Sequence, residues 1–187
     1  MEQATPEARQ SAQDRLLAAA AMLFYRDGIA AIVRKAGVAR KSLYNNFASK
    51  SDLVAAYLRL RHAEWLALHR DRAAGATGPA AQVLAVFDAC PDHARRKDER
   101  GFRGCRLLNA AGEFPEGDAG RAAVRAHKEE VEAIIARHTA GLMPGDPARA
   151  AHPALLLEGA TVRAGLEGRG DCLAQARDFA AAMLAAP

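Results

Sequence analysis

Hydrophobic residues recur along this chain at the spacing of helices. Near the N-terminus, Leu16, Ala20 and Leu23 lie four and three residues apart, which predicts an amphipathic helix over about residues 11–26. Gly28 supplies a C-terminal stop for this helix. The sequence contains no run of alternating β-branched residues, so it predicts an all-α protein.

Two short helices are expected next, over residues 30–36 and 39–47. Gly37 lies between them, and glycine permits the tight turn that joins two helices at an angle. Leu43 and Phe47 are four residues apart and can pack inward together, which leaves the polar and basic residues of the second helix on its other faces.

The rest of the chain predicts longer helices, about nine in total. A capping box at Ser49–Asp52 opens a helix that continues to about residue 69. A helix is expected from about residue 83, and Pro91 and the polar run that follows should interrupt or end this helix. Another is expected over residues 119–142. The last two are expected from Asp146-Pro147 or Pro153 onward, and through Leu173 to Leu184.

Composition supports helices and limits the cellular context. Half of the 187 residues are hydrophobic, mostly Ala and Leu, and only 5% are aromatic. No apolar run approaches the roughly 20 residues of a membrane-spanning helix, so no membrane partner is expected. The first residues lack the basic start and apolar centre of a signal peptide, and three cysteines at irregular spacing do not form a disulfide framework. We therefore expect a cytoplasmic protein.

The positive charge of the chain is concentrated near its N-terminus. Residues 1–70 carry 11 Lys and Arg against 6 Asp and Glu, whereas residues 71–187 carry 15 against 16. The segment from Arg34 to Lys50 contains five basic residues and no acidic one. This pattern is typical of a phosphate-binding face, although a solvated helix surface would have the same charge.

Residues 36–53, AGVARKSLYNNFASKSDL, resemble the helix-turn-helix signature of the TetR family of bacterial transcriptional regulators. Residues 101–114 more weakly resemble a segment of one TetR-like subgroup. The resemblance implies a recognition helix over residues 39–47. It also implies three parts: an N-terminal three-helix helix-turn-helix DNA-binding domain (1–50), a connecting helix (51–70) and a C-terminal helical ligand-binding and dimerisation domain (71–187).

The residue types around the recognition helix fit duplex DNA. Arg40 and Lys41 can reach phosphates or guanine edges, and Asn45 can pair with an adenine edge or a phosphate. The candidate DNA-binding residues are Arg34, Arg40, Lys41, Ser42, Tyr44, Asn45, Asn46 and Lys50. The expected partner is a palindromic double-stranded DNA operator, bound by a dimer.

The segment after Gly28 departs from the family pattern. Gly28-Ile29 runs directly into the second helix, so about five or six residues and a helix-capping Ser or Thr are missing relative to the family. Either the sequence is the ordered part of a longer chain, or the scaffold is truncated. The alternative function is therefore a helical ligand-binding or scaffold protein whose DNA binding is impaired by the shortened loop.

The resemblance further implies an effector pocket and a dimer interface in the second domain. A small apolar or amphipathic effector is expected. The candidate effector-binding residues are Phe87, Phe102, Cys105, Leu108, Asn109 and His127. Cys105 could instead be a redox sensor. A homodimer is expected to form through Leu155, Gly159, Val162, Leu166, Phe179 and Met183. In both cases ordinary core packing is the alternative.

Enzymatic and metal-binding functions find little support. All four serines lie in the first 51 residues, outside the larger domain. Cys90 and His93 form one C-x-x-H pair without a second pair nearby. His127 and His138 would stand roughly 16 Å apart on one helix, too far to share a metal ion. We expect no catalytic residue, no cofactor and no metal, and we expect a repressor that its effector releases from DNA.

Overall fold

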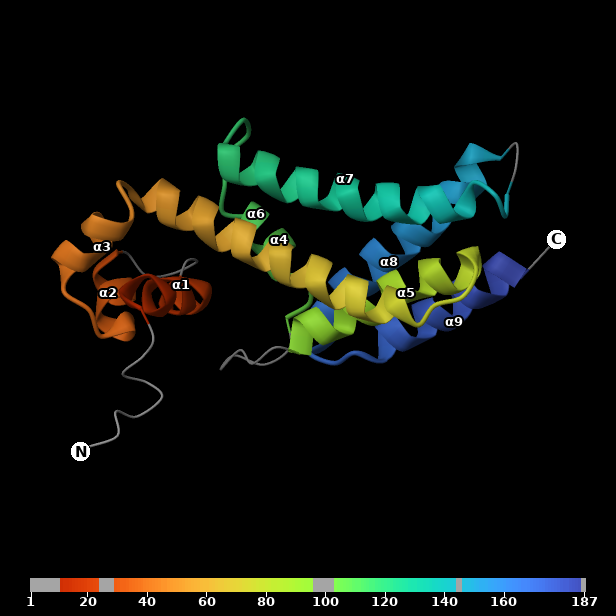
Figure 1. Ribbon diagram of the computed structural model, residues 1–187, viewed down its shortest axis with the longest axis horizontal. Coiled ribbons are helices and arrows are strands. Elements are labelled where there is room, and N and C mark those ends of the chain that lie inside the picture. Colours follow the sequence, from red (N-terminus) through yellow and green to blue (C-terminus); the bar gives the residue numbers. More distant parts are fainter. Residues whose placement is uncertain (1–10, 24–28, 96–102, 144–145, 186–187) are drawn as a thin grey trace.

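The computed structural model describes residues 11–23, 29–95, 103–143 and 146–185. Within these ranges the chain forms nine α-helices and no strand, which confirms the predicted all-α fold (Figure 1). The helices are α1 Ala12–Leu23, α2 Ile29–Ala36, α3 Arg40–Asn46, α4 Lys50–Ala74, α5 Pro79–Arg95, α6 Arg106–Ala111, α7 Ala119–Thr139, α8 Pro147–Glu167 and α9 Asp171–Ala185. In this part of the chain, no helix combines the length and the hydropathy that a bilayer span requires.

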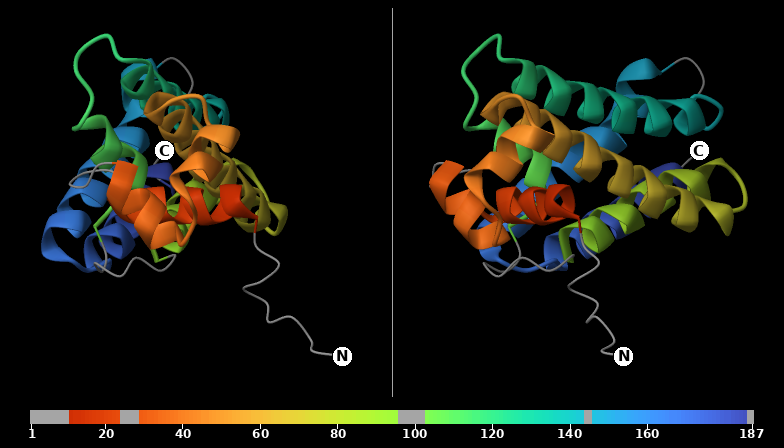
Figure 2. Two further views of the ribbon diagram at one scale, coloured as in Figure 1. Left: turned by 90° about the vertical axis from the view of Figure 1, so that its left-hand side faces the viewer. Right: turned by 60° about the vertical axis from the view of Figure 1, so that its left-hand side comes forward.

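The molecule is elongated, with α1, α2 and α3 grouped at one end (Figure 1). Helix α4 begins in this group and runs into the larger group, where it packs against α5 and α7. Helices α8 and α9 pack along each other. The left view of Figure 2 shows the α1–α3 end turned toward the viewer. A single helix therefore leads from the small group into the large one.

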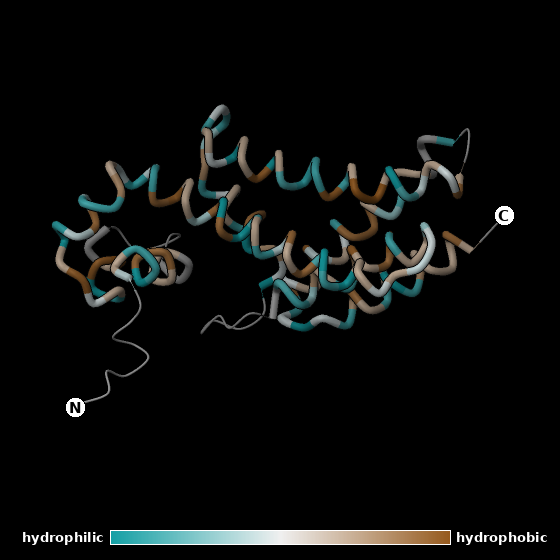
Figure 3. The backbone as a smooth tube through the Cα atoms, viewed as in Figure 1, coloured by the Kyte–Doolittle hydropathy of each residue, from teal (hydrophilic) through white to brown (hydrophobic). Residues whose placement is uncertain are grey.

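Two hydrophobic clusters hold these helices together. The N-terminal cluster joins α1–α3 and the first half of α4 to α6 and the start of α7; its buried members include Leu16, Ile32, Leu43, Phe47, Leu53, Tyr57, Leu107 and Val124. The C-terminal cluster joins the second half of α4 to α5, α7, α8 and α9; its buried members include Trp65, Val86, Phe87, Ile135, Leu157 and Leu173. Along α7, hydrophobic and hydrophilic residues follow one another within the helical turns (Figure 3). This is expected for a helix with one buried side.

Local signals fix the turns around α3. Gly37 has a φ of +61°, the left-handed conformation that favours glycine. The Gly37 and Val38 amides donate to the carbonyls of Arg34 and Val33, which completes a Schellman motif at the end of α2. Ser49 caps α4 by accepting a hydrogen bond from the Asp52 amide at 3.1 Å, as the capping box predicts.

Helices α5 and α8 each continue through a proline because tertiary contacts outweigh its cost, and α8 begins at the first of its two predicted starts. Helix α5 begins at Pro79 and ends at Arg95, so it passes through Pro91 and ends within the polar run that was predicted, together with Pro91, to interrupt or end it. A proline inside a helix costs roughly 3 kcal/mol. Burial of the Val83, Val86 and Phe87 side chains offsets this cost, at roughly 1.5–3 kcal/mol for each. Helix α8 likewise begins at Pro147 and contains Pro153.

Helix α4 extends five residues beyond the predicted end at residue 69. The Gln82 side-chain amide donates hydrogen bonds to the carbonyls of Ala73 at 3.1 Å and Ala76 at 2.8 Å. These bonds tie the start of α5 to the end of α4 and to the turn that follows it. Gly28, after which the sequence predicts a shortened loop, lies outside the described residues, and α2 begins at Ile29.

Candidate functional site

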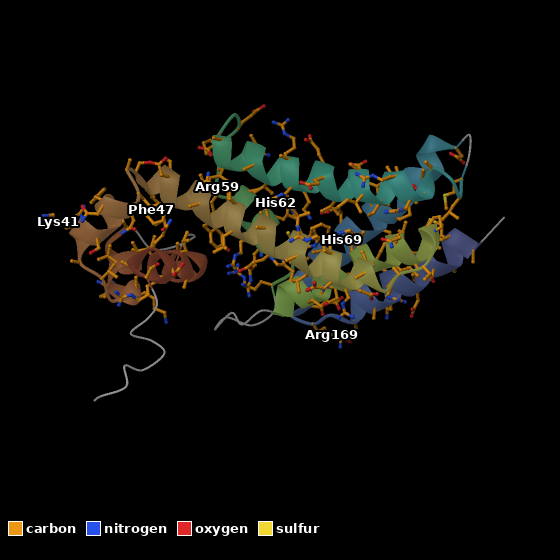
Figure 4. The ribbon with its side chains drawn as sticks, viewed as in Figure 1. Lys41, Phe47, Arg59, His62, His69 and Arg169 are labelled. Atoms are coloured by element: carbon orange, nitrogen blue, oxygen red, sulfur yellow. The ribbon has the colours of Figure 1, made fainter. Side chains whose placement is uncertain are left out.

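Helix α3 lies at the end of the molecule, held by two anchors. Leu43 is fully buried and Phe47 is nearly so, and both pack in the N-terminal cluster. Figure 4 shows Lys41 at the outer tip, on the end of the molecule away from α9. The buried pair orients the short helix, and the remaining side chains of α3 are left for contacts with a partner.

The predicted DNA-binding residues come from three consecutive helices. Arg34 belongs to α2 and Lys50 to α4, and the other six belong to α3. All are exposed except Ser42, which is half-buried. None of the four cations Arg34, Arg40, Lys41 and Lys50 forms an ion pair with another described residue. Their charges are therefore free to attract phosphates.

Two neighbouring asparagines on α3 differ in their hydrogen bonding. The Asn46 side-chain amide donates to the Ser42 carbonyl of its own helix at 2.7 Å. Asn45 is exposed and makes no side-chain hydrogen bond to another described residue. Both the donor and the acceptor of Asn45 are thus available for the bidentate contact that reads adenine.

Replacing Asn45 by Ala is expected to relax base preference at one position of each half-site, by roughly 1–3 kcal/mol. Asn46→Ala is the matched control, because its amide already serves the helix, and it should leave the preference unchanged. Selection of bound sequences from a random duplex library measures both. A wild-type sequence profile for Asn45→Ala would remove this residue from base reading.

A small cavity lies among the larger helices, and we call it the core cavity. Its volume is about 20 Å³, room for one water molecule. It is lined by Trp65 of α4, Cys90 and His93 of α5, Gly104 and Cys105 before α6, His127, Lys128 and Val131 of α7, and Leu157, Glu158 and Thr161 of α8. Residues from five separate parts of the chain therefore converge there.

Two of the six predicted effector residues, Cys105 and His127, line the core cavity. Phe87 is instead buried in the C-terminal cluster, and Phe102 lies outside the described residues. Leu108 and Asn109 are half-buried on α6, where the Asn109 amide donates to the Arg103 carbonyl at 2.8 Å. This bond gives Asn109 a structural contact in the turn before α6.

The backbone beside Cys105 packs closely against α8. A Cβ added at Gly104 would lie 2.6 Å from the Thr161 carbonyl oxygen, and one added at Gly165 would lie 2.7 Å from the Arg103 carbonyl oxygen. Both are backbone atoms, so neither can move aside cheaply. The two glycines thus allow the segment that carries Cys105 to touch the helix that carries Thr161.

Polar side chains cross this region in pairs. The Lys128 ammonium lies 2.6 Å from a Glu158 carboxylate oxygen, which ties α7 to α8. The Nδ1 atoms of His62 and His127 are 2.9 Å apart, a hydrogen bond that ties α4 to α7. Trp65 meets the His127 ring edge-on, with ring centroids 5.5 Å apart.

Burial sets the protonation of two groups at the core cavity. It lowers the pKa of His127 to about 3, and the nearby positive charges of Lys128, His62 and His93 act in the same direction. Burial also raises the pKa of the Cys90 thiol to about 12. Near neutral pH, His127 is uncharged and Cys90 is a protonated thiol with little nucleophilic character.

The residues that sequence reasoning missed are mainly on α4. His62, Trp65 and His69 are spaced at i, i+3 and i+7, which is the signal that could have placed them on one helix face. Figure 4 shows His62 and His69 along α4, beside the larger group of helices. Within the described residues, no group of three or more His, Cys, Asp or Glu could hold a metal ion.

An apolar stripe on α8 and α9 faces outward. Leu155 is 69% exposed, Val162 47%, Leu166 84% and Phe179 67%. Of the remaining predicted interface residues, Gly159 is exposed and Met183 is half-buried. The stripe therefore does not close the core of a single chain.

Comparisons with known proteins agree with this arrangement. Residues 16–57 match the family model described as bacterial regulatory proteins, tetR family. A comparison with curated protein sequences found no match.

Solved structures with the same fold are regulators. A TetR-family transcriptional regulator from Streptomyces coelicolor is 29% identical, with 92% of this chain and 94% of that chain covered and a TM-score of 0.82. A TetR transcriptional regulator from Streptomyces avermitilis is 27% identical, with 91% and 98% covered and a TM-score of 0.72. Regulatory protein TetR from Rhodobacter sphaeroides is 24% identical, with 92% and 98% covered and a TM-score of 0.75.

The matched segment contains α3 and its anchors, and the similarity of fold extends over nearly the whole chain. With its helix-turn-helix at one end and helical bundle at the other, the chain has the fold of TetR-family transcriptional regulators, and its residues 16–57 match the model of that family.

Proposed function

We propose that the protein is a repressor that binds palindromic operator DNA as a homodimer and leaves it when a small effector binds. The observation that carries the DNA part is the set of exposed cations Arg34, Arg40, Lys41 and Lys50, none of which forms an ion pair with another described residue. Each can replace a counterion on the DNA backbone, so binding should depend strongly on salt. We place this activity in the cytoplasm, with residues 1–50 as the DNA-binding domain, 51–70 as the connecting helix and 71–187 as the regulatory domain.

The proposed effector is a small apolar or amphipathic molecule that occupies an enlarged core cavity. At about 20 Å³ the cavity has no room for such a molecule. The effector must therefore bind and stabilise a conformation with a wider cavity. Trp65 lies on α4, and the start of α4 follows α3 after only three residues. A shift of α4 would thus change the position of the recognition helix.

The test of the proposed function is duplex binding as a function of salt. Replacing Lys50 by Ala should weaken binding to all sequences to a similar extent and reduce the log-log salt slope by about 0.9, as expected for one lost phosphate contact. Arg125→Ala is the control, since it removes an exposed cation from α7. Fluorescence anisotropy with a labelled duplex, measured across a salt series, gives both quantities.

Three outcomes separate the alternatives. A selected consensus sequence, with binding lost on addition of a small molecule, supports the repressor. If the log-log salt slope of Lys50→Ala equals that of the wild type, then the basic surface is only a solvated helix surface and does not contact phosphates. Absence of any duplex binding would favour the helical ligand-binding or scaffold protein.

A further inference from the structure

Two histidines meet between α4 and α7, and one of them lines the core cavity. The Nδ1 atoms of His62 and His127 are 2.9 Å apart, with the two rings at 85° to each other. On its other side, His62 places Nε2 3.2 Å from a Glu130 carboxylate oxygen. Figure 4 shows His62 on α4, where this helix passes α7. We propose that the two histidines form a relay, in which protonation of His62 changes His127 from a hydrogen-bond acceptor to a donor toward the core cavity.

When both rings are neutral, the hydrogen bonds of His62 determine the tautomer of His127. A neutral imidazole has one N–H donor and one bare acceptor nitrogen, and a carboxylate only accepts. The proton of neutral His62 therefore lies on Nε2, toward Glu130, and its Nδ1 is bare. This bare nitrogen accepts a hydrogen bond from Nδ1–H of His127. The Nε2 atom of His127 is then a bare acceptor.

A further proton reverses the direction of the hydrogen bond between the rings. A doubly protonated His62 donates from both nitrogens, so Nδ1 of His127 must become the acceptor. The bridging proton passes from His127 to His62, and the added proton is held at Nε2 of His127. The pair gains one proton and one positive charge. The charge is on His62, whereas the new N–H donor is on His127.

The surroundings of the pair place the positive charge on His62. The His62 and Glu130 side chains are 30% and 48% exposed, whereas His127 is buried. Burial lowers the pKa of His127 to about 3, and the positive charges of Lys128, His62 and His93 act in the same direction. The titratable and charged groups around His127 come from all the elements that enclose the cavity: His62 of α4, Cys90 and His93 of α5, Cys105 before α6, Lys128 of α7 and Glu158 of α8.

The Nε2 atom of His127 is available to a ligand in the core cavity. Its Nδ1 is bound to His62, and Nε2 forms no hydrogen bond with another described residue. Two other polar groups of the lining are already paired: Lys128 with Glu158 at 2.6 Å, and the Thr161 hydroxyl with the Leu157 carbonyl at 2.7 Å. Near neutral pH, His127 therefore selects a ligand with an uncharged N–H or O–H donor. This selection rests on the proposed effector site, whereas the relay does not.

Nitrogen NMR of protein labelled with ¹⁵N-histidine tests the relay without ligand or DNA. Protonated and bare ring nitrogens have well separated chemical shifts, so the spectrum distinguishes both tautomers from the cationic ring. His127 should carry its proton on Nδ1 at about pH 8 and on Nε2 at about pH 5, on either side of the usual titration of histidine. His127→Gln assigns the signals. His152→Gln, at an exposed position of α8, is the control and should leave both states unchanged.

Two substitutions at His62 separate the relay from a titration of His127 alone. His62→Lys has only donors, so His127 should carry its proton on Nε2 at both pH values. His62→Leu has no hydrogen-bonding group, so the tautomer of His127 should no longer change with pH, and this variant serves if the lysine does not fold. One tautomer at both pH values in the wild type, or a pH response that persists in either variant, would overturn the relay.

Two fused-ring probes of the same shape test the selection of a ligand. Indole has an N–H donor where benzofuran has an ether oxygen. At about pH 8 the wild type should bind indole about 2- to 10-fold more tightly, as expected for one neutral hydrogen bond. Calorimetry should show no such preference at about pH 5, or in His62→Lys at either pH. Equal affinities of the wild type at the higher pH would overturn the selection. If the tautomer changes as expected and neither probe binds, the relay stands and the proposed effector site fails.

Discussion

Val162→Asp is expected to convert the protein to a monomer and to lower its operator affinity by at least about 1,000-fold, to the level of non-specific binding. Val162 lies in the middle of the outward apolar stripe, with 47% of its surface exposed. An aspartate there would place a charge inside a proposed apolar interface, where it lacks a partner. A recognition helix of seven residues reads few base pairs, so one protomer selects a site poorly.

A second substitution tests the same interface without touching the core. A Cβ at Gly159 would meet nothing within 4 Å, so Gly159→Arg fits a lone chain and clashes only with a partner. Ala133→Asp is the control for charge, since Ala133 is exposed on α7. Light scattering gives the mass and anisotropy gives the affinity. A monomeric wild type would contradict the account, and a dimer that survives both substitutions would place the interface elsewhere.

The DNA-binding end was the part most open to prediction, because its signals are local. Leu43 and Phe47 are one helical turn apart, and both are buried in the N-terminal cluster. Gly37 adopts the positive φ that a tight turn between helices requires. Spacing within about fifteen residues was enough to place helix α3 and its exposed side chains.

The core cavity could not be predicted, because its lining residues come from distant parts of the chain. Trp65 and Thr161 are almost a hundred residues apart, and packing of α4 against α7 and of α7 against α8 brings them to one place. Helix periodicity identifies which side of each helix is buried but not which helices meet. Phe87, a predicted effector residue, lies in the C-terminal cluster with Trp65 but does not line the core cavity.

The outward stripe shows a similar limit. Leu155, Val162 and Leu166 have the same spacing as a buried helix face, so their sequence allowed either a monomer core or an interface. In the structure Leu157 and Ala164 take the buried side of α8, and the stripe is left exposed. A helix with hydrophobic residues on both its buried and its exposed face is thus the signal for an interface. This signal can be recognised only when the fold shows which face is buried.

Acid is expected to destabilise the protein through His127, more than through an exposed histidine. The pKa of His127 is about 3 in the folded chain, lowered mainly by burial, against 6.5 for an unhindered histidine. Between these values the unfolded chain binds a proton that the folded chain does not, so the free energy of unfolding falls as pH falls from about 6.5 to about 3. At 1.36 kcal/mol per unit, the loss is of order 4 kcal/mol.

His127→Gln removes this titration and retains a polar group beside His62. Its free energy of unfolding should change less with pH over the same window, by up to that amount, in urea titrations at several pH values. His152→Gln, at an exposed position of α8, is the control and should keep the wild-type profile. If the His127→Gln and wild-type profiles are parallel, then His127 is not a group whose protonation destabilises the fold.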